Sequence, residues 1–191
     1  HYPLRRQRQM CIRDSHRALA AELLPINNKQ GFISPSSFNA MGYCVPAVNA
    51  IKLANPKKQV VGIVGDGAMI ISGMEVITAV REQLGTVYCL FNNNERTANK
   101  SLGHINWGSF ADALECGYFL IANNHDIDIV MRRALETAAH GQPVIVEISI
   151  DYSRRTHYTQ RIEKAQQASL PSSDKLGRVK RAIVRKIMGS K

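Results

Sequence analysis

Two short polar motifs are the residues of this sequence whose types and spacing could do chemistry. Gly65-Asp66-Gly67 and Asn92-Asn93-Asn94 each follow an apolar run, and Asp66 lies 27 residues before Asn93. A carboxylate and an amide oxygen are hard ligands which, together with phosphate oxygens and water, suit an ion such as Mg²⁺. The two glycines leave room for a phosphate to approach the backbone closely.

The elements around these motifs predict how the motifs are positioned. The β-branched runs 59–64 and 86–91 are typical of buried strands. A helix predicted over 68–84, closed by Gly85, joins the two strands. One strand, one helix and two turns therefore account for the residues between Asp66 and Asn93. The chain then returns to the same edge of a parallel sheet, beyond the carboxyl ends of the strands, where such sheets bind ligands. The free N–H groups of the helix start at Ala68 favour an anion there, so the residues predict a site for a Mg²⁺-bound diphosphate.

The rest of the chain continues the alternation of strands and helices. This order predicts an α/β fold, a parallel sheet with helices on both faces. Further helices are predicted over 17–24, 45–54, 109–116 and 126–139, and further strands over 118–121 and 144–150.

The motifs resemble those of the thiamine-diphosphate enzymes, whose signature is G-D-G followed at this spacing by an Asn pair. The flanking text is similar to the acetolactate synthase branch in the segments Ala40–Ala47, Gly73–Val80 and Pro143–Ser153. The resemblance covers about residues 40–153. It implies the thiamine-diphosphate-binding fold, with thiamine diphosphate and Mg²⁺ as cofactors.

The resemblance also implies roles for individual residues. Asp66 and Asn93 would belong to the cofactor site as side-chain ligands of Mg²⁺, and Glu95 would be a ligand through its backbone carbonyl. Met41 matches the bulky apolar residue that props the cofactor in its bent form. The diphosphate would be lined by four residues, namely Gly65, Gly67, Ala68 and Met69.

For the whole enzyme, the resemblance implies decarboxylation of a pyruvate-like 2-keto acid and transfer of the two-carbon unit, a transferase or lyase activity. It also implies a homo-oligomer in which a glutamate on the pyrimidine-binding domain of a partner subunit completes the site. Because 191 residues leave no room for that domain, the chain is expected to be a fragment that is inactive alone.

The distribution of charge and of cysteines argues against several other classes of protein. Residues 1–17 carry a net charge of +4 and residues 152–191 one of +9, which leaves −3 for residues 18–151 out of the total of +10. A nucleic-acid groove on the core is therefore not predicted, and no apolar run is long enough to cross a membrane. The four cysteines are far apart and form no C-x-x-C pair, so idle thiols in the reducing cytoplasm are expected rather than a zinc site.

The sequence predicts three parts. Residues 1–16 read as a foreign or disordered leader, because Arg5–Ser15 resembles translated sequencing-adaptor text. Residues 17–153 form the cofactor-binding domain. Residues 154–191 form a basic tail that ends in a predicted amphipathic helix.

Three alternatives stay open at this stage. The segments 34–40 and 94–98 depart from the family pattern, which leaves room for a non-catalytic relative acting as an assembly module. Another branch of the superfamily, of the pyruvate oxidase, decarboxylase or acyltransferase type, is the second. The third is a protein whose basic tail binds nucleic acid or membrane.

Overall fold

The computed structural model describes residues 20, 23–25, 31–34, 40–92 and 105–150. The chain divides into two compact units, His1–Asp151 and Tyr152–Lys191. All of the second unit lies outside the described residues, as does the predicted leader, so the predicted domain boundaries stay predictions. Of the helix predicted over 17–24, Ala20, Leu23 and Leu24 are described, and the Leu24 N–H donates to the Ala20 carbonyl over 3.0 Å.

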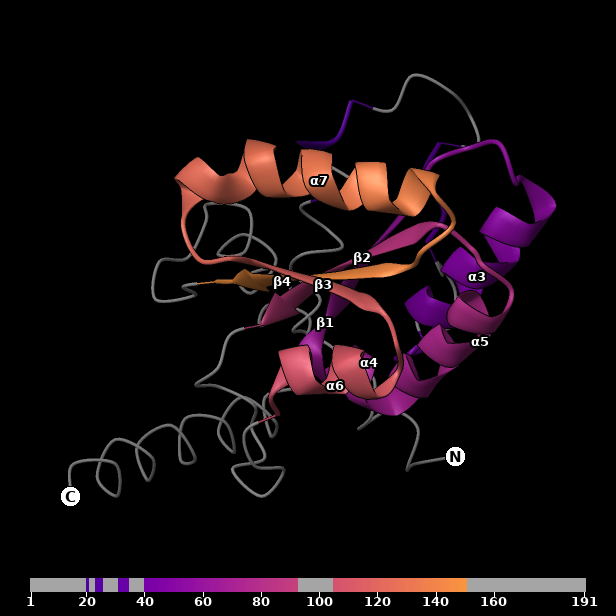
Figure 1. Cartoon of the computed structure of the whole chain (residues 1–191), viewed down its shortest axis with the longest axis horizontal. Helices are drawn as coiled ribbons and strands as arrows, with labels where there is room; N and C mark the ends of the chain where they lie inside the picture. Colours follow the sequence, from indigo (N-terminus) through magenta and orange to yellow (C-terminus); the bar gives the residue numbers. More distant parts are fainter. Residues whose placement is uncertain (1–19, 21–22, 26–30, 35–39, 93–104, 151–191) are drawn as a thin grey trace, which may run out of the picture. The chain divides into compact units, whose positions relative to one another are not determined.

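The described residues form a four-stranded parallel sheet (Figure 1), which confirms the predicted fold class. Its strands stand in the order β1-β2-β4-β3. Each strand matches a predicted one, with small shifts at its ends. The strands are β1 (Val60–Gly65), β2 (Thr86–Asn92), β3 (Gly117–Ile121) and β4 (Val144–Ser149).

The connections explain why helices cover both faces of the sheet. The chain crosses from β1 to β2 and on to β3 in one direction and then steps back to β4. Because such crossovers are right-handed, the last helix must lie on the opposite face. Figure 1 shows α7 on one side of the sheet, and α4 and α6 on the other. The helices are α3 (Cys44–Ala54), α4 (Asp66–Ser72), α5 (Val76–Arg81), α6 (Trp107–Ala113) and α7 (Ile127–Ala139), with 3₁₀ turns η2 (Gly73–Glu75) and η4 (Asn124–Asp126).

Each face of the sheet has its own apolar core. Along β2, Tyr88 and Leu90 point to the layer of α3, α4, α5 and α6, whereas Val87 and Cys89 point to α7. This alternation follows from the two-residue period of a strand. None of the helices in the described part of the chain is long and apolar enough to span a bilayer.

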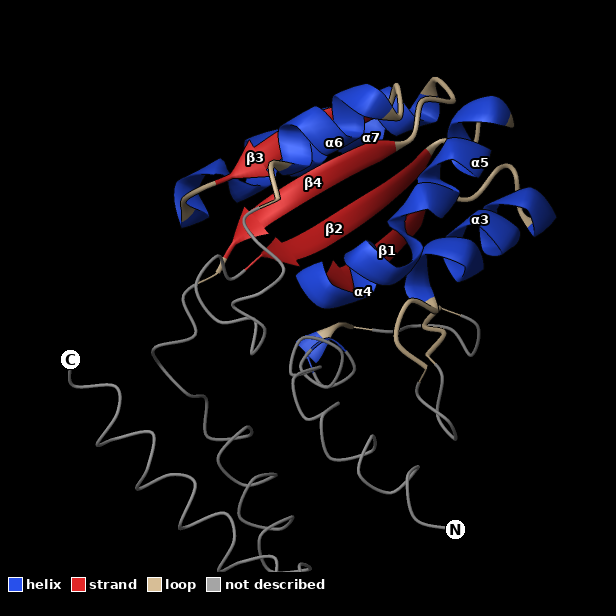
Figure 2. Cartoon of the chain, turned by 90° about the horizontal axis from the view of Figure 1, so that it is seen from below, coloured by secondary structure: helices blue, strands red, loops and turns tan. Residues whose placement is uncertain are grey.

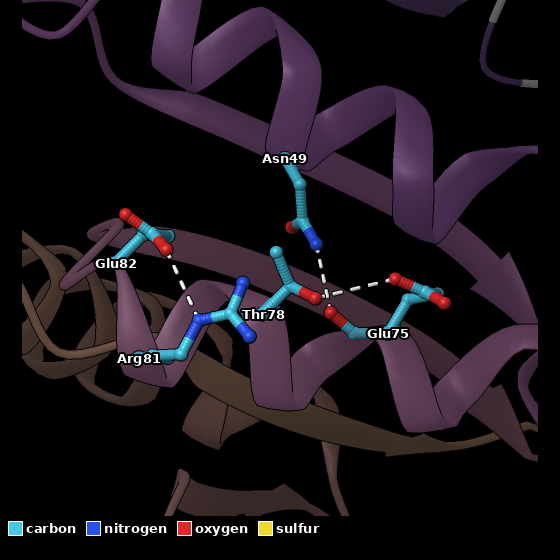
Figure 3. A network of polar contacts seen from close by, with 5 residues as sticks. All are labelled: Asn49, Glu75, Thr78, Arg81 and Glu82. Atoms are coloured by element: carbon cyan, nitrogen blue, oxygen red, sulfur yellow. Dashed lines mark hydrogen bonds and ion pairs between the residues drawn. The ribbon is translucent and has the colours of Figure 1, made fainter.

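The helix predicted over 68–84 is interrupted, which corrects that prediction. It begins at Asp66, tightens into η2 and resumes as α5, which ends at Arg81. A Cβ on Gly73 would lie 3.0 Å from Phe110 Cζ and 3.1 Å from Met69 Sδ, so the backbone at the turn packs closely against its neighbours. The Asn49 amide on α3 donates to the Glu75 carbonyl over 2.8 Å and ties α3 to the turn (Figure 3).

The prediction that Gly85 closes this helix is wrong. The left-handed conformation after α5 belongs to Gln83, whose φ is 52°. Gly85 is required for a different reason, because a Cβ there would lie 1.7 Å from the Ala138 carbonyl oxygen at the end of α7. Only a residue without a side chain lets β2 start so close to α7.

Replacing Gly85 by Ala should therefore destabilise the chain by roughly 1–3 kcal/mol, the usual range for an overpacked core. Gly67→Ala is the matched control, since its Cβ would meet Met41 Cε at an ordinary 3.5 Å. Its expected effect is within about 0.5 kcal/mol. Urea unfolding of the two variants measures both. Equal free energies of unfolding would contradict the close approach of Gly85 to α7.

A second prediction concerns three cysteine thiols, of which Cys89 and Cys116 are buried and Cys44 is half-buried. Burial raises the pKa of Cys89 and of Cys116 to about 12, and that of Cys44 to about 11. In the native chain these three thiols should resist iodoacetamide at a pH of about 8 and react only after unfolding, as followed by peptide mass spectrometry.

Since their pKa is raised above the ordinary 9.0, their contribution to stability should be lost as the pH rises from about 9 toward 12. Rapid alkylation of Cys89 in the native chain would refute the expected protection of the thiols by burial.

Candidate functional site

The polar motifs meet at the carboxyl edge of the sheet. Strand β1 pairs with β2 in parallel, and Gly65 stands opposite Phe91. The residues that follow, Asp66 and Asn92, therefore come next at the same edge, and Figure 2 shows β2 and β4 ending there side by side. The predicted return of the chain to a neighbouring strand end is confirmed. Asn93 and Glu95 lie outside the described residues, so their roles as ligands stay predictions.

Asp66 is the first residue of α4 and is half-buried. Its Oδ1 accepts a hydrogen bond from the Gly67 N–H over 2.7 Å. A carboxylate at this position is stabilised by the positive end of the helix dipole. The structure thus holds a carboxylate at the strand edge where the sequence predicts a cation.

The residues expected to line a diphosphate differ in what they can offer. Gly65 and Gly67 flank Asp66, and Ala68 packs partly against the core. The Met69 side chain is 0% exposed and lies inside that core. Met69 could therefore contact a phosphate only through its backbone N–H.

Met41 lies over the Gly-Asp-Gly turn. Its Cε is 3.5 Å from where a Cβ would stand on Gly67, and the side chain is 46% exposed. The turn formed by Met41 and Gly42 packs closely against α4, because Gly42 has a φ of 86° and a Cβ on it would meet Ile71 at 2.9 Å. Two motifs that are distant in the sequence thus come together, and Met41 is not a core residue.

The sequence reading missed Glu147, which it treated only as part of a strand. The Glu147 carboxylate accepts hydrogen bonds from the Asn92 side-chain amide over 2.7 Å and from the Tyr118 hydroxyl over 2.6 Å. Burial, together with the bond to Glu147, raises the pKa of Tyr118. The signal in the sequence was one acid within the apolar run 144–150, because a buried carboxylate needs donors around it.

Of the expected ligands, Asp66 lies among the described residues, and its carboxylate is a donor that suits a hard cation. In the part of the chain that the structure describes, no group of three or more His, Cys, Asp or Glu residues gathers around a point. A cation at this edge would take oxygens from Asp66, from residues beyond Asn92 and from the ligand itself. Such a mixed set is typical of Mg²⁺ bound with a phosphate compound.

Comparison with known proteins identifies relatives of the same kind. Residues 15–148 match the family described as "Thiamine pyrophosphate enzyme, C-terminal TPP binding domain". The chain is 25% identical over 146 residues to a sulfoacetaldehyde acetyltransferase of Alcaligenes xylosoxydans xylosoxydans, which covers 69% of this chain and 24% of that protein. It is 26% identical over 157 residues to an acetolactate synthase large subunit of Buchnera aphidicola subsp. Acyrthosiphon pisum, covering 74% of this chain and 28% of that subunit.

A solved structure shares the fold. The thiamine diphosphate-dependent 4-hydroxybenzoylformate decarboxylase of Rhodococcus jostii RHA1 superposes with a TM-score of 0.52 at 21% identity, over 60% of this chain and 24% of that one. The chain thus spans about a quarter of the length of these relatives. Since the family match covers most of its residues, the chain belongs to the C-terminal thiamine pyrophosphate-binding domains of the thiamine pyrophosphate enzymes.

Proposed function

We propose that this chain binds the diphosphate of thiamine diphosphate through Mg²⁺ at the carboxyl edge of β1 and β2. The observation that carries the proposal is the position of Asp66. This residue directly follows β1, whose last residue pairs with Phe91 near the end of β2. A carboxylate at the start of a helix, next to a second polar strand end, suits a cation held together with a phosphate.

Each residue of the proposed site has a physical task. Asp66 and Asn93 bind Mg²⁺ through side-chain oxygens, and Glu95 binds it through its carbonyl. Gly65 and Gly67 admit the diphosphate, and Ala68 and Met69 offer backbone N–H groups to it. When bound, thiamine diphosphate supplies the electron sink for cleaving the bond beside a keto carbonyl.

Met41 is the proposed apolar support of the cofactor. Its half-exposed side chain beside Gly67 suits contact with a ligand rather than with the core. An unbranched thioether side chain can fit closely against an aromatic ring. The support needs only apolar bulk at this place.

The proposed reaction of the complete enzyme is decarboxylation of a 2-keto acid followed by transfer of the remaining unit, as in acetolactate synthase. Matched relatives bear the names acetolactate synthase and acetyltransferase, which supports the transfer step of this proposal. The other half of the site would come from the pyrimidine-binding domain of a partner subunit in a homo-oligomer, and the isolated chain would not turn over substrate.

Asp66→Asn tests the proposed cation site. The amide can still accept from the Gly67 N–H, so the fold should persist. The loss of charge should weaken Mg²⁺-dependent binding of thiamine diphosphate by at least about ten-fold in calorimetry, or about 1.4 kcal/mol. The matched control is Asp112→Asn, an exposed acid on α6 whose replacement should change nothing.

Chelation of Mg²⁺ should abolish binding to the unmodified chain. Equal affinities for the Asp66 variant and the parent would exclude Asp66 as a ligand. If neither the chain nor a longer version of the protein binds the cofactor, the assembly-module alternative is favoured.

Met41→Ala tests the apolar support. Loss of the side chain should weaken thiamine diphosphate binding about five-fold, or about 1 kcal/mol, because apolar contact with the ring is lost. Stability toward urea should stay unchanged, because the residue is half-exposed. Met74→Ala is the matched control, since Met74 is 61% exposed and lies on η2. The proposed role of Met41 is excluded if both variants bind the cofactor equally well.

A further inference from the structure

The most buried acid in the described part of the chain lies near the carboxyl edge of the sheet. Glu147 is 9% exposed on β4 and points, like Ile145, to the layer of α3, α4, α5 and α6. The other residues of β4 that face a core are apolar. A carboxylate in such surroundings is costly unless hydrogen bonds compensate its desolvation.

Both carboxylate oxygens of Glu147 accept a hydrogen bond from a neighbouring strand. The Asn92 amide on β2 donates to Oε1 over 2.7 Å, and the Tyr118 hydroxyl on β3 donates to Oε2 over 2.6 Å. Because β4 lies between β2 and β3, Glu147 links its two neighbouring strands diagonally. Asn92 lies two residues after the paired partner of Glu147 on β2, and Tyr118 lies two residues before its paired partner on β3. With a donor on each side, its carboxylate has a fixed orientation.

Asn92 is held both through its side chain and through its backbone. Its side chain is bound by Glu147, and its backbone carbonyl accepts from the Ile150 N–H over 3.0 Å. Asn92 is the last residue of β2, and the next residue in the chain is Asn93, the proposed Mg²⁺ ligand. The direction in which the chain leaves β2 therefore depends on how firmly Asn92 is held.

We propose that Glu147 is a positioning residue for the cation site, acting through Asn92. The inference rests on the proposed function of Asp66 and Asn93. A purely structural role explains less, since apolar side chains at such a place would often stabilise the fold as well as or better than buried polar ones. A hydrogen-bonded carboxylate instead fixes one geometry, as the outer partners of metal ligands do.

The first experiment measures positioning without any cation. Hydrogen exchange is followed by NMR at the Ile150 amide, whose bond to Asn92 reports on the end of β2. Glu147→Gln keeps the shape of the side chain but removes its charge and one acceptor, so Ile150 should exchange at least about ten-fold faster while the amides of β1 are unchanged. The control Glu136→Gln, an exposed acid on α7, should have no effect. Tyr118→Phe leaves the bond between Glu147 and Asn92 in place and should have a smaller effect.

The second experiment measures the consequence for the cation. Mn²⁺ replaces Mg²⁺ in the presence of thiamine diphosphate, and free Mn²⁺ is counted by electron paramagnetic resonance. Glu147→Gln and Asn92→Ala should each weaken Mn²⁺ binding about ten-fold or more. The double variant should be little worse than either single one, because both changes break the same link.

The outcomes separate this inference from the proposed function. Unchanged exchange at Ile150 in Glu147→Gln overturns the positioning role, whatever the cation does. Faster exchange with unchanged Mn²⁺ affinity also overturns it and leaves Glu147 a structural residue. A parent chain that takes up no Mn²⁺ with thiamine diphosphate refutes the proposed function itself, and with it any role of Glu147 toward the cation.

Discussion

The parallel pairing of β1 with β2 is the constraint on which the site depends. Parallel strands all have their carboxyl ends at the same edge of a sheet. Asp66 and Asn92, at the ends of β1 and β2, therefore become neighbours, although a helix, a 3₁₀ turn and a second helix separate them in the chain. Asp66 stands where β1 gives way to α4, and Asn92 stands where β2 ends. A slip of the β2 register by one residue would turn Tyr88 and Leu90 out of their core, which makes the alignment costly to change.

Several packing features hold this edge in place. The Tyr88 hydroxyl on β2 donates to the Asn49 side chain on α3, and the Asn49 amide donates to the backbone of η2. Through Asn49, the middle of β2 is thus linked to the helical segment that begins at Asp66. At the carboxyl end of β2, Glu147 on β4 binds Asn92. The first link holds the middle of β2 and the second holds its end, while Met41 remains half-exposed beside the Gly-Asp-Gly turn.

The fold could be predicted from local patterns because its strands are short, mostly apolar runs bounded by turn residues, as in Val60–Gly65. The details that were missed are tertiary. Gly85 looked like a helix terminator, but the residue is required by the approach of α7, which no local pattern encodes. The predicted start of α6 was two residues late, although Asn106 caps the helix by accepting from the Ser109 N–H over 3.0 Å. Of the site, the adjacency of the two strand ends was predictable from spacing, whereas the buried position of the Met69 side chain and the partners of Glu147 depend on strands and helices that are distant in the sequence.

The most direct test of the account is a crystal structure of the protein with thiamine diphosphate and Mn²⁺, in which anomalous scattering locates the cation. The account predicts one Mn²⁺ ion at the carboxyl edge of β1 and β2, within about 2.0–2.3 Å of an oxygen of Asp66 and of the Asn93 side-chain oxygen, and bridged to the diphosphate. A cation bound elsewhere, or a diphosphate held at this edge with Asp66 turned away from the metal, would contradict it.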